Sequence, residues 1–189
     1  MPLGDVFTPE RHKAPLTNLR RLKSKDMPKF YYSQLDKRWA SQRIGSALFT
    51  LGQKGCCITE ICESLGDFGF TVTPDILAKD PTLFTDKNHE KGAGLVLWGE
   101  VARWLLQHYP SHTFTFHRFL KPDPKTINAN LKPGTGVLLE VANGSHWLKA
   151  DRKCLLRQDW NCRDPWGGVA RTAIGDYGDV SGFCILQVT

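Results

Sequence analysis

No stretch of this 189-residue sequence approaches the run of about 18 apolar residues that a transmembrane helix needs. A secretory signal is missing as well, because Asp5, Glu10 and Arg11 follow the first residues where an apolar segment would be required. Internal repeats and low-complexity tracts are also absent, which excludes solenoid and fibrous architectures. We therefore expect no membrane span and synthesis in the cytoplasm without a signal peptide.

Metal-binding cysteine patterns are missing too. The sequence has six cysteines but no CxxC pair, and their spacing relative to the histidines does not form a zinc site. In a reducing cytoplasm we expect mostly free thiols. Cys154 and Cys162 could still pair if the protein is released into an oxidising medium. The six are Cys56, Cys57, Cys62, Cys154, Cys162 and Cys184.

The composition is that of a folded protein with one distinct segment. Hydrophobic residues make up 41% of the chain and aromatic residues 11%, which are typical globular values. The length suits one compact domain, which we place at residues 29–189. Residues 1–28 differ, because they contain several prolines, lack apolar periodicity and carry a basic cluster between Arg20 and Lys25. They form a basic arm that could pack on a partner subunit or on the back face of the domain.

The net charge of +6 indicates a surface that favours polyanions. Nucleic acid, an anionic cell wall and an acidic protein partner all fit that sign. The basic arm has no interleaved aromatic residues and no recognisable recognition helix, so nucleic acid is the least expected of the three. An anionic cell wall and an acidic protein partner remain, and a protein partner could be bound by the arm at residues 1–28.

Helical signals precede strand signals along the domain. Apolar side chains share one face at helical spacing in residues 54–65 and 95–108. A capping residue followed by proline predicts shorter helices at residues 73–79 and 123–131. The strand candidates are residues 113–119, 137–141, 147–150, 154–158 and 183–188. This order predicts an α+β fold in which N-terminal helices pack on a C-terminal antiparallel β-sheet.

Two adjacent thiols stand where a helix is predicted to begin. Gly55 permits a tight turn into that helix and leaves room for a substrate backbone, and Cys56 and Cys57 follow it. A thiol at a helix N-terminus lies at the positive end of the helix dipole, which lowers its pKa and favours the thiolate. The alternative interpretation is that both cysteines are small buried hydrophobic residues.

A histidine and an aspartate downstream supply groups that could activate a thiol. His146 follows the turn pair Asn143-Gly144, the strongest hairpin signal in the chain. Asp164 opens the turn-forming segment DPWGG, and its spacing from His146 predicts that the two lie on neighbouring strands. There the carboxylate could accept from the imidazole and orient it, although a turn aspartate bonded to its own backbone is the alternative.

Together these motifs resemble the bacteriocin-processing-type cysteine peptidases and their wider papain-like relatives. The likeness covers residues 31–189 and leaves the basic arm without a counterpart. The segments that carry it are residues 32–39 (YSQLDKRW), Gly45, Thr50, residues 55–59 (GCCIT), residues 73–74 (TP), residues 145–147 (SHW) and residues 164–165 (DP).

The resemblance implies a papain-like fold and hydrolysis of peptide bonds without a metal or an organic cofactor. By position, Cys56 matches the nucleophile, His146 the general base and Asp164 the acid that orients the base. Relatives usually carry a small non-thiol residue at the position of Cys57, which leaves the choice between the two thiols open.

The resemblance also implies a glutamine in the oxyanion hole. Gln34, within the SQLD segment, matches that position. Gln53 is the rival, because it lies three residues before Cys56. The side chain of this glutamine would stabilise the developing oxyanion together with the backbone N–H of the nucleophile.

Two substrate classes and one rival hypothesis follow. The substrate could be the peptide cross-links of cell-wall peptidoglycan, cut by an enzyme that is virion-associated in a phage or released on lysis. A protein precursor or leader peptide is the other substrate class. The rival is a structural or interaction subunit of a large assembly such as a phage tail, with a papain-like fold whose activity is secondary or lost. Geometry discriminates between them, because an enzyme needs sulfur beside imidazole in an open groove.

Overall fold

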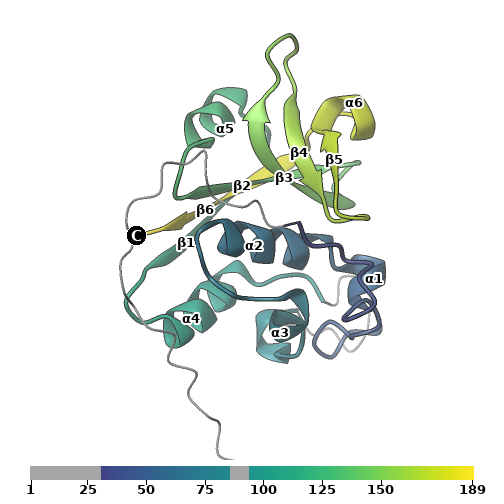
Figure 1. Cartoon of the computed structure of the whole chain (residues 1–189), viewed down its shortest axis with the longest axis vertical. Helices are drawn as coiled ribbons and strands as arrows, with labels where there is room; N and C mark the ends of the chain where they lie inside the picture. The colour runs from purple at the N-terminus through teal and green to yellow at the C-terminus, as the bar shows by residue number, and fades with distance from the viewer. Residues whose placement is uncertain (1–30, 86–93) are drawn as a thin grey trace, which may run out of the picture.

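The computed structural model describes residues 31–85 and 94–189, and the predicted basic arm at residues 1–28 lies outside them. A layer of helices comes first along the chain and lies below the sheet in Figure 1. These elements are α1 (Leu51–Lys54), α2 (Cys56–Asp67), α3 (Pro74–Ala78), the 3₁₀ helix η1 (Pro81–Leu83) and α4 (Trp98–His108).

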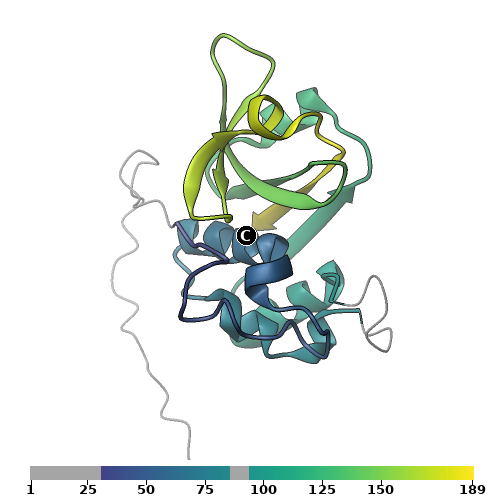
Figure 2. The ribbon, with the colours of Figure 1, turned by 90° about the vertical axis from the view of Figure 1, so that its right-hand side faces the viewer.

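A six-stranded sheet forms the second layer, and two short helices cover its far face (Figures 1 and 2). The strands are β1 (Phe114–Phe119), β2 (Thr135–Val141), β3 (His146–Lys153), β4 (Trp160–Asp164), β5 (Val169–Thr172) and β6 (Gly182–Val188). Their spatial order is β1-β6-β2-β3-β4-β5, and every neighbouring pair is antiparallel. The two covering helices are α5 (Pro124–Asn130) and α6 (Ala173–Tyr177). The expectation of an α+β architecture with helices preceding an antiparallel sheet is therefore confirmed.

Two details of the predicted elements were wrong. The predicted strand at residues 154–158 does not form, because β3 ends at Lys153 and the next strand begins at Trp160. The apolar pair within it lies at the exposed turn of the β3–β4 hairpin, where no strand pairs with it. The helix predicted over residues 54–65 also begins later, since Lys54 belongs to α1 and Gly55 separates it from α2.

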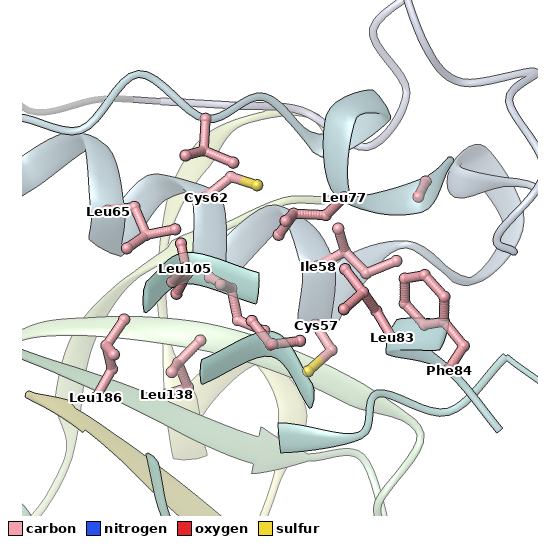
Figure 3. Close-up of a cluster of buried hydrophobic side chains, with 14 of the residues drawn as sticks. Cys57, Ile58, Cys62, Leu65, Leu77, Leu83, Phe84, Leu105, Leu138 and Leu186 are labelled. Atoms are coloured by element: carbon pink, nitrogen blue, oxygen red, sulfur yellow. The ribbon is translucent and has the colours of Figure 1, made fainter. Parts of the chain in front are cut away.

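The sheet is buried on both faces, which explains why its central strands are almost continuously apolar. On β2, Leu138 faces the layer of α2, α3 and α4, while Val137 and Leu139 face α5 and α6. Neighbouring residues of a strand point to opposite faces, so one strand contributes to both clusters. Figure 3 shows the first cluster, in which Leu138 and Leu186 of the sheet meet α2 and α4.

Helix α2 is the central helix of the structure and fixes the position of the two adjacent thiols. Residues 56–66 are all buried, and α2 packs against β2 and β3. The turn into α2 is tight, because a Cβ atom at Gly55 would lie 2.5 Å from the carbonyl oxygen of Leu51. Only glycine fits there without a shift of the backbone. The first residue of α2 is therefore held at the edge of the sheet.

Candidate active site

Three elements bring the predicted catalytic side chains together. Cys56 is the first residue of α2, His146 the first of β3 and Asp164 the last of β4. Because β3 and β4 are paired, the prediction that His146 and Asp164 lie on neighbouring strands is confirmed. The imidazole Nε2 donates to Asp164 Oδ1 at 2.8 Å. The other ring nitrogen, Nδ1, is left for Cys56, whose side chain is close enough to the imidazole to raise its pKa.

The surroundings of His146 favour its charged form. Burial of the imidazole acts to lower its pKa. Hydrogen bonds to Asp164 and Cys56, together with the negative charges of these two groups, outweigh burial and raise the pKa of His146 to about 9. The histidine therefore carries a proton at neutral pH and stands between a carboxylate and a sulfur. An imidazolium in this position stabilises a thiolate.

Asp164 is held as a carboxylate by three donors. Its side chain is 1% exposed and accepts from His146, from the backbone N–H of Trp166 at 2.8 Å, and from the hydroxyl of Tyr177. Burial acts to raise the pKa of Asp164, but the bonds from His146, Tyr177 and Trp166 outweigh it and lower the pKa. The aspartate is therefore ionised and fixes the orientation of the imidazole.

Tyr177 and Trp166 are site residues that the sequence did not reveal. The phenol ring of Tyr177 lies 5.1 Å from the His146 ring, centroid to centroid, and burial and the bond to Asp164 raise the pKa of its hydroxyl. Together with His146, these two residues line a surface hollow of about 300 Å³. Tyr177 lies at the end of a five-residue helix with no recognisable motif, so no sequence signal marked it.

A second hollow, of about 220 Å³, lies at the other end of β4 and contains neither a cysteine nor a histidine. Its lining includes Asn128, Lys153 and Trp160. Of these two hollows, the one beside His146 is therefore the one lined by a predicted catalytic side chain.

The structure separates the two adjacent thiols. Cys57 lies in the hydrophobic cluster between α2 and the sheet (Figure 3), and burial raises its pKa well above the ordinary value. Burial likewise raises the pKa values of Cys62, Cys162 and Cys184. Exposure does not separate the two thiols, since Cys56 is 8% and Cys57 9% exposed, but Cys56 lies outside that cluster and beside His146. All six cysteines are free thiols, so Cys154 and Cys162 do not pair here.

The two candidate glutamines lie in different settings. Gln34 is buried, its backbone N–H donates to Pro165 O at 2.8 Å, and its side-chain Nε2 donates to Gly52 O at 3.1 Å. These bonds tie it to the segment after Asp164 and to the segment before α2, while one side-chain N–H stays available. Gln53 is exposed, and its side-chain oxygen accepts from the backbone N–H of Thr50 at the start of α1. The setting of Gln34 therefore agrees better with a role beside Cys56.

A second group of ionisable side chains lies between α2 and the strands β3 and β4, and we call it the buried charge cluster. Its members are Glu60, Glu63, Asp67, Lys149, Asp151 and Arg163. Arg163 is fully buried and donates to Asp67 at 3.0 Å and to Asp151 at 2.9 Å. The guanidinium thus neutralises two carboxylates at once.

The two glutamates of the cluster are differently placed. Glu63 accepts from the backbone N–H of Tyr32 at 2.6 Å, and burial, only partly offset by Arg163, raises its pKa to about 7. Glu60 is fully buried, and among the described residues neither of its carboxyl oxygens has a hydrogen-bond partner. Burial, reinforced by the charge of Glu63, raises the pKa of Glu60 well above its usual range. Burial therefore favours the neutral acid form of Glu60.

Within residues 31–85 and 94–189, no group of three or more histidine, cysteine, aspartate or glutamate side chains is arranged to hold a metal ion. In the same part of the chain, every helix is too short or too polar to cross a membrane. No protein-family model and no curated protein matches this sequence. Function is therefore inferred from the chemistry of the site.

Proposed function

We propose that this protein is a papain-like cysteine peptidase that hydrolyses peptide bonds, with Cys56 as nucleophile, His146 as general base and Asp164 as the residue that orients the base. One observation carries the proposal: a single imidazole is hydrogen-bonded to a buried carboxylate, has its pKa raised by a thiol at a helix N-terminus, and lines an open hollow. This is the arrangement that activates a thiol for nucleophilic attack.

The reaction begins with a thiolate–imidazolium pair. His146 holds the proton of the Cys56 thiol, and the positive end of the α2 dipole adds to the stabilisation of the thiolate. The thiolate attacks the substrate carbonyl, and the carbonyl π electrons move to the oxygen. Cys56 itself is nearly covered, so the substrate carbonyl must reach it from the hollow lined by His146 and Trp166.

The oxyanion forms beside two donors. The backbone N–H of Cys56 belongs to the first turn of α2, where helical N–H groups have no partner within the helix. The free side-chain N–H of Gln34 is the second donor, and each such donor is typically worth about 3 kcal/mol. His146 then gives its proton to the departing amine as the C–N bond breaks. Water hydrolyses the resulting thioester and restores the thiol.

Thiol reactivity tests this proposal directly. Wild-type protein and His146→Ala are treated with iodoacetamide near pH 6, and each cysteine is followed by peptide mapping. An ordinary thiol is less than about 1% ionised at that pH. We expect Cys56 to be alkylated at least about a hundredfold faster than Cys154, the partly exposed thiol that serves as internal control. In His146→Ala the rate at Cys56 should fall to that of an ordinary thiol.

The opposite result is equally clear. Slow labelling of Cys56, unchanged in His146→Ala, would overturn the peptidase assignment and favour a structural subunit built on the same fold. If the thiol is activated, hydrolysis is screened on purified peptidoglycan and on a peptide library, with Cys56→Ala as the inactive control. Cleavage of peptidoglycan alone would indicate a cell-wall hydrolase, and cleavage of peptides alone would indicate a peptidase of protein precursors.

A further inference from the structure

The connection between β3 and β4 is the most exposed apolar feature of the described structure. It projects from the end of the sheet that lies away from α1 and α3 in both views (Figures 1 and 2). At its turn Leu155 and Leu156 are 100% and 96% exposed, whereas the next most exposed large apolar residue, Leu120, is 79% exposed. Single exposed leucines are ordinary on protein surfaces, but two adjacent leucines entirely in solvent have no packing role.

The charges around the two leucines all have one sign. Arg152, Lys153 and Arg157 are exposed, and residues 152–158 contain no acid. The two acids that bracket this segment are engaged elsewhere. Asp151 accepts from Arg163, and Asp159 is 4% exposed and accepts from the N–H groups of residues 174 and 175. We call residues 152–158 the hairpin tip.

The hairpin tip is remote from the candidate active site. His146 begins β3 and the two leucines of the tip follow its other end, so the eight residues of β3 separate the leucines from the site. At about 3.3 Å per residue that is roughly 25 Å. A surface bound at the tip would therefore leave the hollow beside His146 open.

We propose that the hairpin tip docks the protein reversibly on a bilayer rich in anionic phospholipid. Leu155 and Leu156 enter the boundary between headgroups and acyl chains, and the three cations pair with lipid phosphates. An apolar end ringed by lysine and arginine is the pattern of interfacial binding to anionic membranes. The proposal concerns attachment alone and does not depend on the peptidase assignment.

The size of the tip favours a bilayer over a protein partner. A stable protein interface buries about 800 Å² on each partner, far more than two leucine side chains offer. A lipid surface needs no complementary shape, so a small tip can insert without a preformed pocket. Because the cations act through charge, binding should weaken as salt is raised.

Vesicle flotation with the full-length chain tests the proposal. The probes are vesicles of phosphatidylcholine with about 30% phosphatidylglycerol, and vesicles of phosphatidylcholine alone, in low and high salt. We expect the wild type to float with the anionic vesicles in low salt and to remain unbound with the neutral ones. Leu155→Ser/Leu156→Ser should bind at least about tenfold less at equal lipid concentration. Leu120→Ser is the matched control and should bind like the wild type.

The variants should keep their fold, because the replaced side chains are in solvent, and circular dichroism checks this. Failure of the wild type to float, or equal flotation of the double variant, would overturn the proposal. Sedimentation velocity tests the alternative that the tip contacts a second copy of the protein. If the wild type self-associates and the double variant does not, the tip is a protein contact and the lipid proposal is wrong. Iodoacetamide labelling of Cys56 should be the same in both proteins, which separates this result from the test of the active site.

Discussion

Asp164 and Glu60 carry the same chemical group at nearly the same depth, yet their pKa values are shifted in opposite directions. Asp164 is 1% exposed and accepts three hydrogen bonds, and its pKa is lowered although burial opposes ionisation. Glu60 is 0% exposed and accepts none among the described residues, and burial raises its pKa well above the usual range. The number of hydrogen-bond donors that face a carboxylate, more than the depth of its burial, decides the direction of its pKa shift.

A related contrast separates the candidate active site from the buried charge cluster. At the candidate active site, charge is held next to an open hollow, where a substrate could use it. In the buried charge cluster, charge joins α2 to β3 and β4 around the fully buried Arg163, with Asp67 and Asp151 only partly exposed. The first group should therefore govern reactivity, and the second should govern stability.

The largest expected effect comes from removing the central cation of the buried charge cluster. Arg163→Met leaves the carboxylates of Asp67 and Asp151 without their main partner, so we expect the free energy of unfolding to fall by about 3–5 kcal/mol. Urea denaturation at pH 7.5 measures it. Arg171→Met is the matched control and should cost less than about 1 kcal/mol, because Arg171 is half exposed and its ion pairs are 3.9 Å long. Equal losses of unfolding free energy in Arg163→Met and Arg171→Met would contradict the view that the buried charge cluster governs stability.

The pH dependence of stability should have two contributions, one from Glu63 in the buried charge cluster and one from His146 at the candidate active site. Both pKa values are raised, that of Glu63 from 4.5 to about 7 and that of His146 from 6.5 to about 9. A raised pKa means that the stabilisation is complete below the unfolded value and is lost as pH rises through the folded value. We therefore expect the unfolding free energy to fall first between pH 4.5 and 7 and again between pH 6.5 and 9. Each step amounts to at most about 3 kcal/mol.

Two variants assign these steps. Glu63→Gln should remove the lower step and keep the upper one, and His146→Gln should do the reverse. Urea denaturation at half-unit intervals of pH gives both curves. Two outcomes would show that Glu63 and His146 do not control the pH dependence of stability. One is a wild-type curve that is flat from pH 5 to 9, and the other is a variant that keeps the step it should remove.

A smaller effect is expected from neutralising the acid that orients His146. Asp164→Asn keeps the shape but weakens the hold on the imidazolium, so we expect alkylation of Cys56 at pH 6 to slow by about a hundredfold, equivalent to about 2.7 kcal/mol. Asp151→Asn, a change of the same kind in the buried charge cluster, should leave the alkylation rate within about twofold. If both variants slow alkylation alike, the reactivity of Cys56 depends on general stability.

The smallest effect is expected at Glu60. Because burial favours the neutral form of this acid, we expect Glu60→Gln to replace one uncharged group by another of the same size. The free energy of unfolding should change by less than about 1 kcal/mol. A loss above about 2 kcal/mol in urea denaturation would mean that Glu60 is ionised in the folded protein.

Residue order and spacing predicted much of this architecture. Periodicity and proline capping located α2, α3, α4 and α5, because these helices carry their own local signals. The Asn143-Gly144 pair located the hairpin of β2 and β3, where both residues sit in turn conformations of positive φ. The short elements α1, η1, β4, β5 and α6 were missed, since three to five residues give no readable period.

The site was partly predictable for the same reason. Cys56, His146 and Asp164 could be selected from helix position, hairpin position and spacing, and their roles remain predictions. Tyr177 could not be selected, because its contact with Asp164 depends on how α6 packs beside β4. Nor could the sequence separate Cys56 from Cys57, since one residue of helical rotation decides which of them enters the core.

The place of β6 in the sheet has a consequence for the order in which the molecule forms. This strand is made after all the others, yet it lies between β1 and β2 and pairs with both. A nascent chain already contains Cys56, His146 and Asp164 long before it contains Gly182. Until β6 inserts, β1 and the helix packed on it have no connection to β2 and β3 through the sheet. We therefore expect α4 and β1 to join the rest of the molecule only after synthesis of β6, whereas α2 can pack on β2 and β3 before it.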